Sequence, residues 1–352
     1  MAYTTINKST DYFNTKLYDG SNSSPLNITG VGFQPDLTWI KHRNGTSKHQ
    51  LIDAVRGVTK TLASDDNAAE ETRTQTLTAF GSDGFTLGSE SDVNSGGRTF
   101  ASWNWKAGTT SGLSGGTITP SAYSINSTAG FGIYKYTGTG STGTIASGLS
   151  SVKCFIIKAL DNSSNGWVVY HHKLGTDKYV QLDESASAYT GTSQFNDTAP
   201  TTSATNSLIS VGTAGSSNNS GRDYIMYAFS ELSGYSKFGK YTGNGNADGN
   251  FIYTGFKPAL FIVKRITDAS EQWIMFDNKR STPNGFNGVD KNLKPSLTES
   301  EQSQSPPSMD FLSNGIKLRN TDGTFNNSSK EFIYMAFGQS LVGSNNVPCT
   351  AR

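Results

Sequence analysis

Hydrophobic residues in this chain occur in short runs separated by turn sequences, and this pattern predicts β-strands. In the run LTWIK at 37–41 the apolar and polar positions alternate, so Leu37 and Trp39 share one face. Two similar runs, 155–157 and 260–263, are apolar at every position, which is typical of a central strand with both faces covered. We therefore expect the large aromatic residues of these strands to be core residues and not a ligand platform.

Helical periodicity is almost absent. The segment DDNAAEETRTQTL at 65–77 has a helix-compatible composition but no apolar stripe, and we expect a short peripheral helix there. Asn-Gly and Asp-Gly dipeptides, which accept the positive φ angles of tight hairpins, separate many of the apolar runs. The predicted fold class is all-β.

The strand pattern is repeated three times along the chain. GFQPDLTWIK at 32–41 and GFKPALFIVK at 255–264 share five identical positions, and VKCFIIKAL at 152–160 is a third, more distant copy. Each unit ends with an aromatic strand: TFASWNW at 99–105, DYIMYAF at 223–229 and EFIYMAF at 331–337. Repeats of this length are the size of ordinary domains and not of solenoid turns.

We therefore predict three tandem antiparallel β-sandwich domains of the jelly-roll or lectin-like type. The predicted boundaries are 1–107 for the first domain, 108–130 for a flexible Gly/Ser/Thr-rich linker, 131–232 for the second domain, 233–338 for the third domain and 339–352 for a C-terminal tail. The linker composition predicts a hinge between the first two domains.

Composition limits the partners. Charged residues make up 16% of the 352 residues and the formal net charge is +1, without a basic run, so we expect no nucleic-acid partner. No long apolar segment predicts membrane insertion, and the N-terminus lacks a signal-peptide pattern, so we expect synthesis in the cytoplasm. Cys154 and Cys349, the two cysteines of the chain, are expected to be free thiols.

Three short motifs resemble functional sites but lack the required context. GTGSTG at 138–143 is not followed by the helix that a dinucleotide site needs, and GLSGG at 112–116 lies in the predicted linker. The segment 161–172 starts like a calcium loop but has His172 where a bidentate Glu is required. We expect no cofactor and no metal.

Carboxylates near aromatic residues could form a glycosidase pair, but the candidate residues are not repeated. They are Asp65, Asp66, Glu70 and Glu71, or Asp183 and Glu184. Charged residues that do repeat are Lys41, Lys158 and Lys264, together with Asp53 and Asp277. Repeated charges of this kind are typical of strand-edge caps or structural ion pairs, so we expect no catalytic residues.

Candidate ligand contacts lie at irregular positions of the repeat and at its loop tips. His171 and His172 stand where the other units have aspartate, which indicates either surface residues or a ligand contact. The loop tips at 216–220 and 244–250 are rich in polar residues. The candidate binding residues are His171, His172, Asn218, Asn219, Asn244 and Asn246.

Several of these segments resemble a set of tailed-bacteriophage proteins that is common in marine phages and has repeated GFxPxxxxxK β domains. The resemblance rests on GYSKFGKYTGNGNADGNFIYTGFKPALFIVKR at 234–265, MDFLSNGIKLRN at 309–320, the terminal LVGSNNVPCTAR, and GVGFQPDLTWIKHR, LIDAVRG, SDGFTLG and WNWKAG in the N-terminal third. It implies a virion or tail-fibre protein assembled in the host cytoplasm, without catalytic residues.

Two functions fit this interpretation. The first is a tail-fibre or appendage component that binds host-surface glycans through its loops. Such sites are weak singly, so we expect a homotrimer or a similar closed assembly that multiplies them. The alternative is a structural head or collar decoration protein that contacts only other virion proteins.

Overall fold

The computed structural model describes residues 4–196, 199–200, 206–268, 271–281 and 288–340. Almost all of its regular structure is antiparallel β-sheet, as predicted. Its two α-helices are single turns, α1 (Ser91–Asn94) and α2 (Gly323–Asn326), and η1 (Ser9–Asp11) is a 3-10 turn. The helix expected at 65–77 is wrong, because this segment instead contributes strand β6 (Glu71–Thr72) and the start of β7.

The first group of sheets is formed by residues 13–105, here called the first segment. Its large sheet has the order β1-β9-β3-β4, and small sheets have the orders β2-β8-β7 and β5-β6. The strands are β1 (Phe13–Asp19), β2 (Leu26–Thr29), β3 (Leu37–His42), β4 (Gln50–Asp53), β5 (Lys60–Thr61), β6 (Glu71–Thr72), β7 (Leu77–Gly81), β8 (Gly84–Leu87) and β9 (Thr99–Trp105).

The second segment, residues 122–230, repeats this arrangement. Its large sheet has the order β10-β11-β18-β13-β14-β15-β16, and its small sheet is the pair β12-β17. The strands are β10 (Ala122–Asn126), β11 (Phe131–Thr137), β12 (Gly143–Ala146), β13 (Val152–Ala159), β14 (Val168–His171), β15 (Lys178–Gln181), β16 (Tyr189–Thr190), β17 (Leu208–Val211) and β18 (Asp223–Ser230).

The third segment, residues 236–338, has the large sheet β19-β28-β21-β22-β24-β25 and the small sheet β20-β27-β26-β23. The strands are β19 (Ser236–Thr242), β20 (Phe251–Tyr253), β21 (Pro258–Arg265), β22 (Ile274–Asp277), β23 (Gly288–Val289), β24 (Lys291–Leu293), β25 (Gln302–Ser303), β26 (Met309–Leu312), β27 (Gly315–Leu318) and β28 (Glu331–Gly338).

Within each segment the large sheet packs on the small sheet in a β-sandwich-like manner. In the first segment, Ile40 of β3 and Phe100 of β9 meet Ile28 of β2 and Phe85 of β8 in one buried cluster. The second and third segments have equivalent clusters of their own. The alternating side chains of each strand explain this packing, because only every second residue can face the small sheet.

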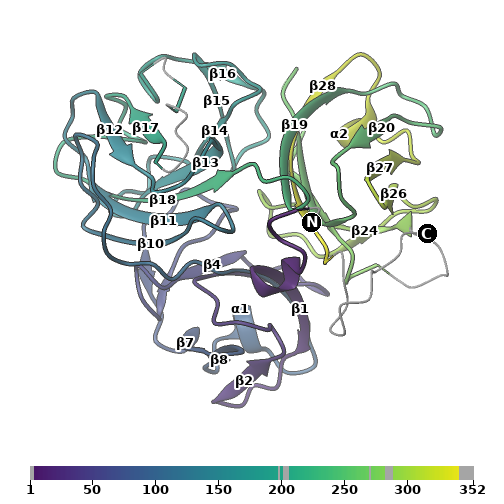
Figure 1. Ribbon diagram of the computed structural model, residues 1–352. Coiled ribbons are helices and arrows are strands. Elements are labelled where there is room, and N and C mark those ends of the chain that lie inside the picture. Colours follow the sequence, from purple (N-terminus) through teal and green to yellow (C-terminus); the bar gives the residue numbers. More distant parts are fainter. Residues whose placement is uncertain (1–3, 197–198, 201–205, 269–270, 282–287, 341–352) are drawn as a thin grey trace.

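The other face of each large sheet is buried as well, in a central core shared by all three segments (Figure 1). Its members include Leu37, Trp39, Trp105, Ile156, Tyr227, Phe229, Ile262, Met335 and Phe337. The prediction that Trp39 and the aromatic residues of the closing strands are core residues is therefore confirmed, with Trp39 3% exposed. Strands that are apolar on both faces serve two cores at once.

Buried side chains join the segments in a closed ring. In each case a residue at the end of β4, β14 or β22 bonds to the last large-sheet strand of the next segment. The contacts are Tyr227 Oη to Asp53 Oδ2 (2.8 Å), His171 Nε2 to Tyr334 O (3.1 Å) and Trp103 Nε1 to Asp277 Oδ2 (3.0 Å). The first segment thus contacts the second, the second contacts the third, and the third contacts the first.

The repeated charges belong to the same ring. Asp53 and Asp277 form fully buried ion pairs with Arg56 and Arg280, at 2.5 Å in both cases. The repeated lysines instead donate to backbone carbonyls, for example from Lys158 to Asn67 O of the first segment (3.1 Å). Burial lowers the pKa of Lys41, Lys158 and Lys264 to about 8.

The stretch 108–130 differs from the expected free linker. β10 lies within it and pairs with β11, and Thr109 bridges to Ile125. Residues 116–118 also lie along β12, where Gly116 and Ile118 both bridge to Ile145. A Gly/Ser/Thr composition indicated flexibility, but backbone pairing and the shared central core hold this stretch against the second segment.

Candidate functional site

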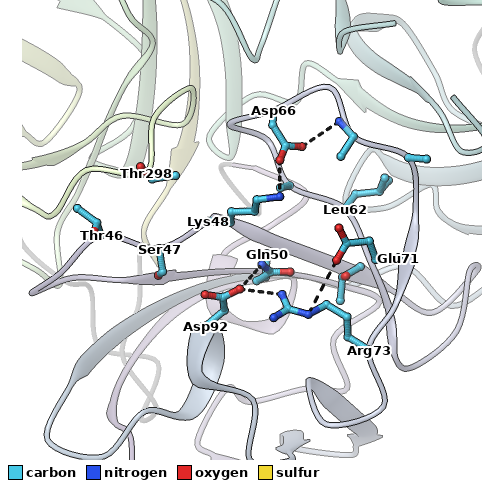
Figure 2. Close-up of a pocket in the computed structure, with 14 residues that line it drawn as sticks. Thr46, Ser47, Lys48, Gln50, Leu62, Asp66, Glu71, Arg73, Asp92 and Thr298 are labelled. Atoms are coloured by element: carbon cyan, nitrogen blue, oxygen red, sulfur yellow. Dashed lines mark hydrogen bonds and ion pairs between the residues drawn. The ribbon is translucent and has the colours of Figure 1, made fainter. Parts of the chain in front are cut away.

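A polar pocket in the first segment is the best candidate for a binding site (Figure 2). Its volume is about 420 Å³, within the usual range for small-ligand sites. Three parts of the first segment form it: the loop between β3 and β4, the chain from β5 to β6, and α1. Thr298 of the third segment completes the wall, and its carbonyl accepts a hydrogen bond from Ser47 N (3.1 Å).

Charged side chains line the pocket in matched pairs. Lys48 Nζ lies 2.6 Å from Asp66 Oδ2 on one side. On the other side, Asp92 Oδ2 accepts hydrogen bonds from Arg73 Nη1 (2.7 Å) and Gln50 Nε2 (3.2 Å), as Figure 2 shows. These bonds fix the positions of several donors and acceptors around one hollow.

The local fold explains why these side chains converge. Gln50 starts β4 and is buried, and its amide donates a hydrogen bond to Asp92 of α1. Arg73 follows β6 and also binds Glu90, the residue before α1, at 2.7 Å. This ion pair ties the end of β6 to the helix that carries Asp92.

Burial and hydrogen bonding shift the pKa values of charged groups at and near the pocket. Burial raises the pKa of Asp65 to about 6, although its Oδ1 accepts a hydrogen bond from His49 N (2.6 Å). The hydrogen bond to Asp66 raises the pKa of Lys48. The lining includes two cationic and three anionic side chains whose charges are largely paired, so the pocket suits a neutral polar ligand better than a free anion.

Four of the six carboxylates considered for catalysis are engaged in structural contacts, whereas Glu71 is exposed and lines the pocket. Asp66 binds Lys48, Asp65 caps the backbone at His49, and Glu70 lies 3.4 Å from the buried Arg56. In the second segment Asp183 Oδ1 accepts from Trp167 N (2.8 Å), the same arrangement as at Asp65.

The predicted binding histidines lie between segments and not at a ligand surface. His171 is 1% exposed and donates to Tyr334 O, while His172 Nε2 contacts Phe238 O at 2.8 Å. Burial lowers the pKa of both, that of His171 to about 3. The expectation of surface residues is wrong for His171, because the inter-segment contact that buries it joins residues distant in sequence.

Asn218 is also structural. It is buried, accepts from Thr139 N (2.8 Å) and donates to Ser141 O (2.6 Å) and Gly212 O (2.7 Å). Asn94 and Asn326 make the same three kinds of bond in the other segments. Each asparagine joins the loop after β1, β11 or β19 to the loop before β9, β18 or β28, the last large-sheet strand of its segment.

The remaining predicted residues stay exposed. Asn219, Asn244 and Asn246 are at the surface, and the carboxamide oxygens of Asn244 and Asn246 accept from backbone N–H groups two residues later. None of the six predicted residues lines the pocket. Among the described residues, no three His, Cys, Asp or Glu side chains gather in a way that could hold a metal ion, and no helix there is long and apolar enough to cross a membrane.

Sequence reasoning missed Lys48, Gln50, Arg73 and Asp92. Of these, only Arg73 lies in the charge-dense stretch 65–73, and Lys48, Gln50 and Asp92 stand at positions that no local motif marks. Cys154 is a buried free thiol, as expected, and Cys349 lies outside the described residues.

Comparison with known protein families identifies the family of this chain. Residues 8–340 match a family described as a domain of unknown function, DUF7483. The match is continuous and spans all three segments. No curated protein and no solved structure matches this chain.

Proposed function

The chain belongs to the DUF7483 family, and we propose that it is a non-enzymatic virion protein of a tailed bacteriophage that binds a host-surface glycan. In this proposal it is a tail-fibre or appendage component made of three tandem β-sandwiches of the jelly-roll or lectin-like type. It is assembled in the host cytoplasm, and its partners are other virion proteins and the glycan.

The observation that carries the proposal is the pocket with its paired charges. Sugar hydroxyls both donate and accept hydrogen bonds, and the carboxylates, amide and cationic groups held around this hollow supply both functions. Because Lys48 and Arg73 already have carboxylate partners, a phosphate or sulfate group would have to displace an ion pair. A neutral saccharide needs no such displacement.

The shared central core supports a role as a particle appendage. A continuous apolar core and the closed ring of buried contacts oppose movement between segments, which suits a part that transmits force. Self-association belongs to the proposal as well, since one pocket per chain would bind weakly and several linked chains would multiply it.

The test compares two lysines with matched surroundings. The purified chain is screened on an array of bacterial surface saccharides, and the best saccharide is then titrated calorimetrically. Lys48→Ala should weaken binding by about fivefold or more, since one charge-assisted bond is lost. Lys135→Ala is the control, because Lys135 is similarly exposed and also pairs with one aspartate, but in the second segment.

An equal loss of saccharide affinity in Lys48→Ala and Lys135→Ala would reject the glycan pocket. So would an array on which the purified chain binds no saccharide. Competition between the purified chain and phage for adsorption to host cells tests the attachment role separately. A chain that binds saccharide but does not compete would leave the pocket without a role in attachment.

A second candidate, the head or collar decoration protein, is favoured by a different feature. Phe251 (46% exposed) and Tyr253 (64% exposed) give the third segment an apolar surface of the kind that docks on a protein. Quantitative mass spectrometry of particles separates the candidates, because decoration proteins occur in far higher copy number than tail appendages.

A further inference from the structure

Among the residues that the structure describes, no strand or bridge covers the outer edge of β20, unlike the edges of its equivalents in the other two segments. β2, β12 and β20 correspond to one another: each pairs with one strand of its small sheet, and the isoleucine of each pairs with an apolar residue there. Each lies at an edge of its small sheet. Natural proteins usually protect such edges, because free backbone groups there pair with other chains.

The first two segments protect this edge in different ways. β2 follows Pro25 and presents Asn27 and Thr29 on its outer face. β12 is covered by the chain itself, as Thr117 N and Ile118 N both donate to Thr144 O, at 2.8 and 2.9 Å. The second segment therefore shows that this edge accepts an added stretch of extended polypeptide.

In the described part of the third segment, neither kind of protection is present. Only residues 231–235 connect the second segment to β19, and they form a turn closed by a bridge between Leu232 and Ser236, so they do not reach β20. β20 reads Phe-Ile-Tyr: Ile252 is buried, and Phe251 and Tyr253 are exposed. By contrast, the neighbouring edge strand β19 carries Lys237 and Lys240, each in an ion pair.

The backbone of β20 is oriented for pairing. Leu318 N donates to Asn250 O and Thr254 N donates to Asn314 O, both at 3.0 Å, so the even-numbered residues face β27. Because backbone groups alternate along a strand, those of Phe251 and Tyr253 face the free edge. These are also the two residues with exposed aromatic rings.

We propose that β20 pairs in antiparallel fashion with β20 of a second copy of this chain, about a two-fold axis at Ile252. The sequence Phe-Ile-Tyr is self-complementary in this arrangement: Phe251 of each copy lies opposite Tyr253 of the other, and both residues offer free backbone groups. The aromatic rings then form cross-strand pairs, which stabilise antiparallel sheets. The small sheets of two copies become one continuous sheet.

This contact does not depend on the glycan pocket, which is formed by the first segment together with Thr298. A two-fold contact gives a dimer, which differs from the trimer expected from the sequence. The dimer presents two pockets, so the contact would supply part of the multiplicity that weak attachment sites require.

The first experiment is sedimentation equilibrium of the full chain over a range of concentrations. The wild type should show a reversible monomer–dimer equilibrium, and Tyr253→Lys should weaken it at least tenfold, because lysine on an edge opposes pairing. Thr29→Lys is the matched control: Thr29 pairs with Gly84 as Tyr253 pairs with Gly315, but on the polar edge of the first segment. It should leave the equilibrium unchanged.

The second experiment tests the register. In a Cys349→Ser background, chains with Phe251→Cys are mixed with chains with Tyr253→Cys under mild oxidation. Directly opposite residues in such a pair have Cα atoms about 5.5 Å apart, within disulfide range, so the mixed disulfide should exceed both like-with-like products.

A wild type that is monomeric throughout, or equal weakening by Tyr253→Lys and Thr29→Lys, would overturn the proposal. A dimer without the preferred mixed disulfide would also overturn it. Because saccharide binding by Tyr253→Lys can be measured independently, failure here is distinguishable from failure of the proposed function.

Discussion

Replacing Asp277 with alanine should destabilise the protein more than any surface substitution, because this carboxylate holds the third segment to the first. It accepts hydrogen bonds from Trp103 Nε1 (3.0 Å), from Lys279 N and Arg280 N (both 2.9 Å), and from Arg280 Nε (2.5 Å). Both ion-pair partners are fully buried. The structure therefore places four hydrogen bonds on a single side chain, and one of them is also the ion pair with Arg280.

The magnitude follows from what the substitution leaves behind. Without Asp277, the Arg280 guanidinium stays buried with Met275 O and Glu301 as its partners. Breaking one side of a buried pair costs about 3–5 kcal/mol, and Glu301, which also pairs with Arg43, offsets a part of that cost. We expect the free energy of unfolding to fall by about 3 kcal/mol or more.

The second segment supplies an internal comparison. At the positions of Asp277 and Arg280 it has His171 and Leu174, and the facing strand has Met335 in place of Trp103. The second segment thus lacks the equivalents of Asp277 and Arg280, and the strand that faces it lacks the equivalent of Trp103. A triple variant, Asp277→His with Arg280→Leu and Trp103→Met, should regain a substantial part of the stability that Asp277→Ala loses.

The assay is urea unfolding at neutral pH, followed by tryptophan fluorescence and by far-ultraviolet circular dichroism. Trp103→Phe, which removes one hydrogen bond to the carboxylate, should cost about 1.5–3 kcal/mol. Combining it with Asp277→Ala should cost less than the sum of the two. A loss below about 1 kcal/mol for Asp277→Ala, or strict additivity, would show that the inter-segment ring contributes little.

Three further substitutions test other parts of the structure. Trp39→Ala should lower the free energy of unfolding by about 3–5 kcal/mol, since it empties part of the central core; a change below about 1 kcal/mol in urea would contradict its burial. Burial lowers the pKa of His171 to about 3, so the stability that its neutral form contributes is fully present above the ordinary histidine pKa of about 6.5 and is lost as pH falls towards 3. His171→Gln should therefore reduce the fall in the free energy of unfolding between pH 7 and pH 4, and an unchanged pH dependence would contradict the burial of His171. Asn326→Ala should cost about 2–4 kcal/mol and speed hydrogen exchange at the amide of Asn244, whereas Asn327→Ala should do neither; equal effects would reject the fastening role.

The sequence by itself determined the all-β class, the threefold repetition and the core position of Trp39 and of the aromatic residues in the closing strands. These follow from short-range chemistry: alternation places Trp39 on one face and Ile40 on the other, and apolar residues on both faces indicate that both are covered. The pocket was not predicted, because the local composition of residues 65–77 could not distinguish a polar helix from the short strand and loops that the structure shows.

Only the tertiary structure decided what covers each face and what meets at each site. The outer faces of the large sheets cover one another, and this association converts His171 from an apparent surface residue into a buried contact with Tyr334. The pocket combines Lys48, Arg73 and Asp92 with Thr298, more than 200 positions away in the chain. The periodicity of apolar residues in a strand indicates that one of its faces is buried. Which other sheet covers that face depends on long-range packing, and local sequence patterns do not encode it.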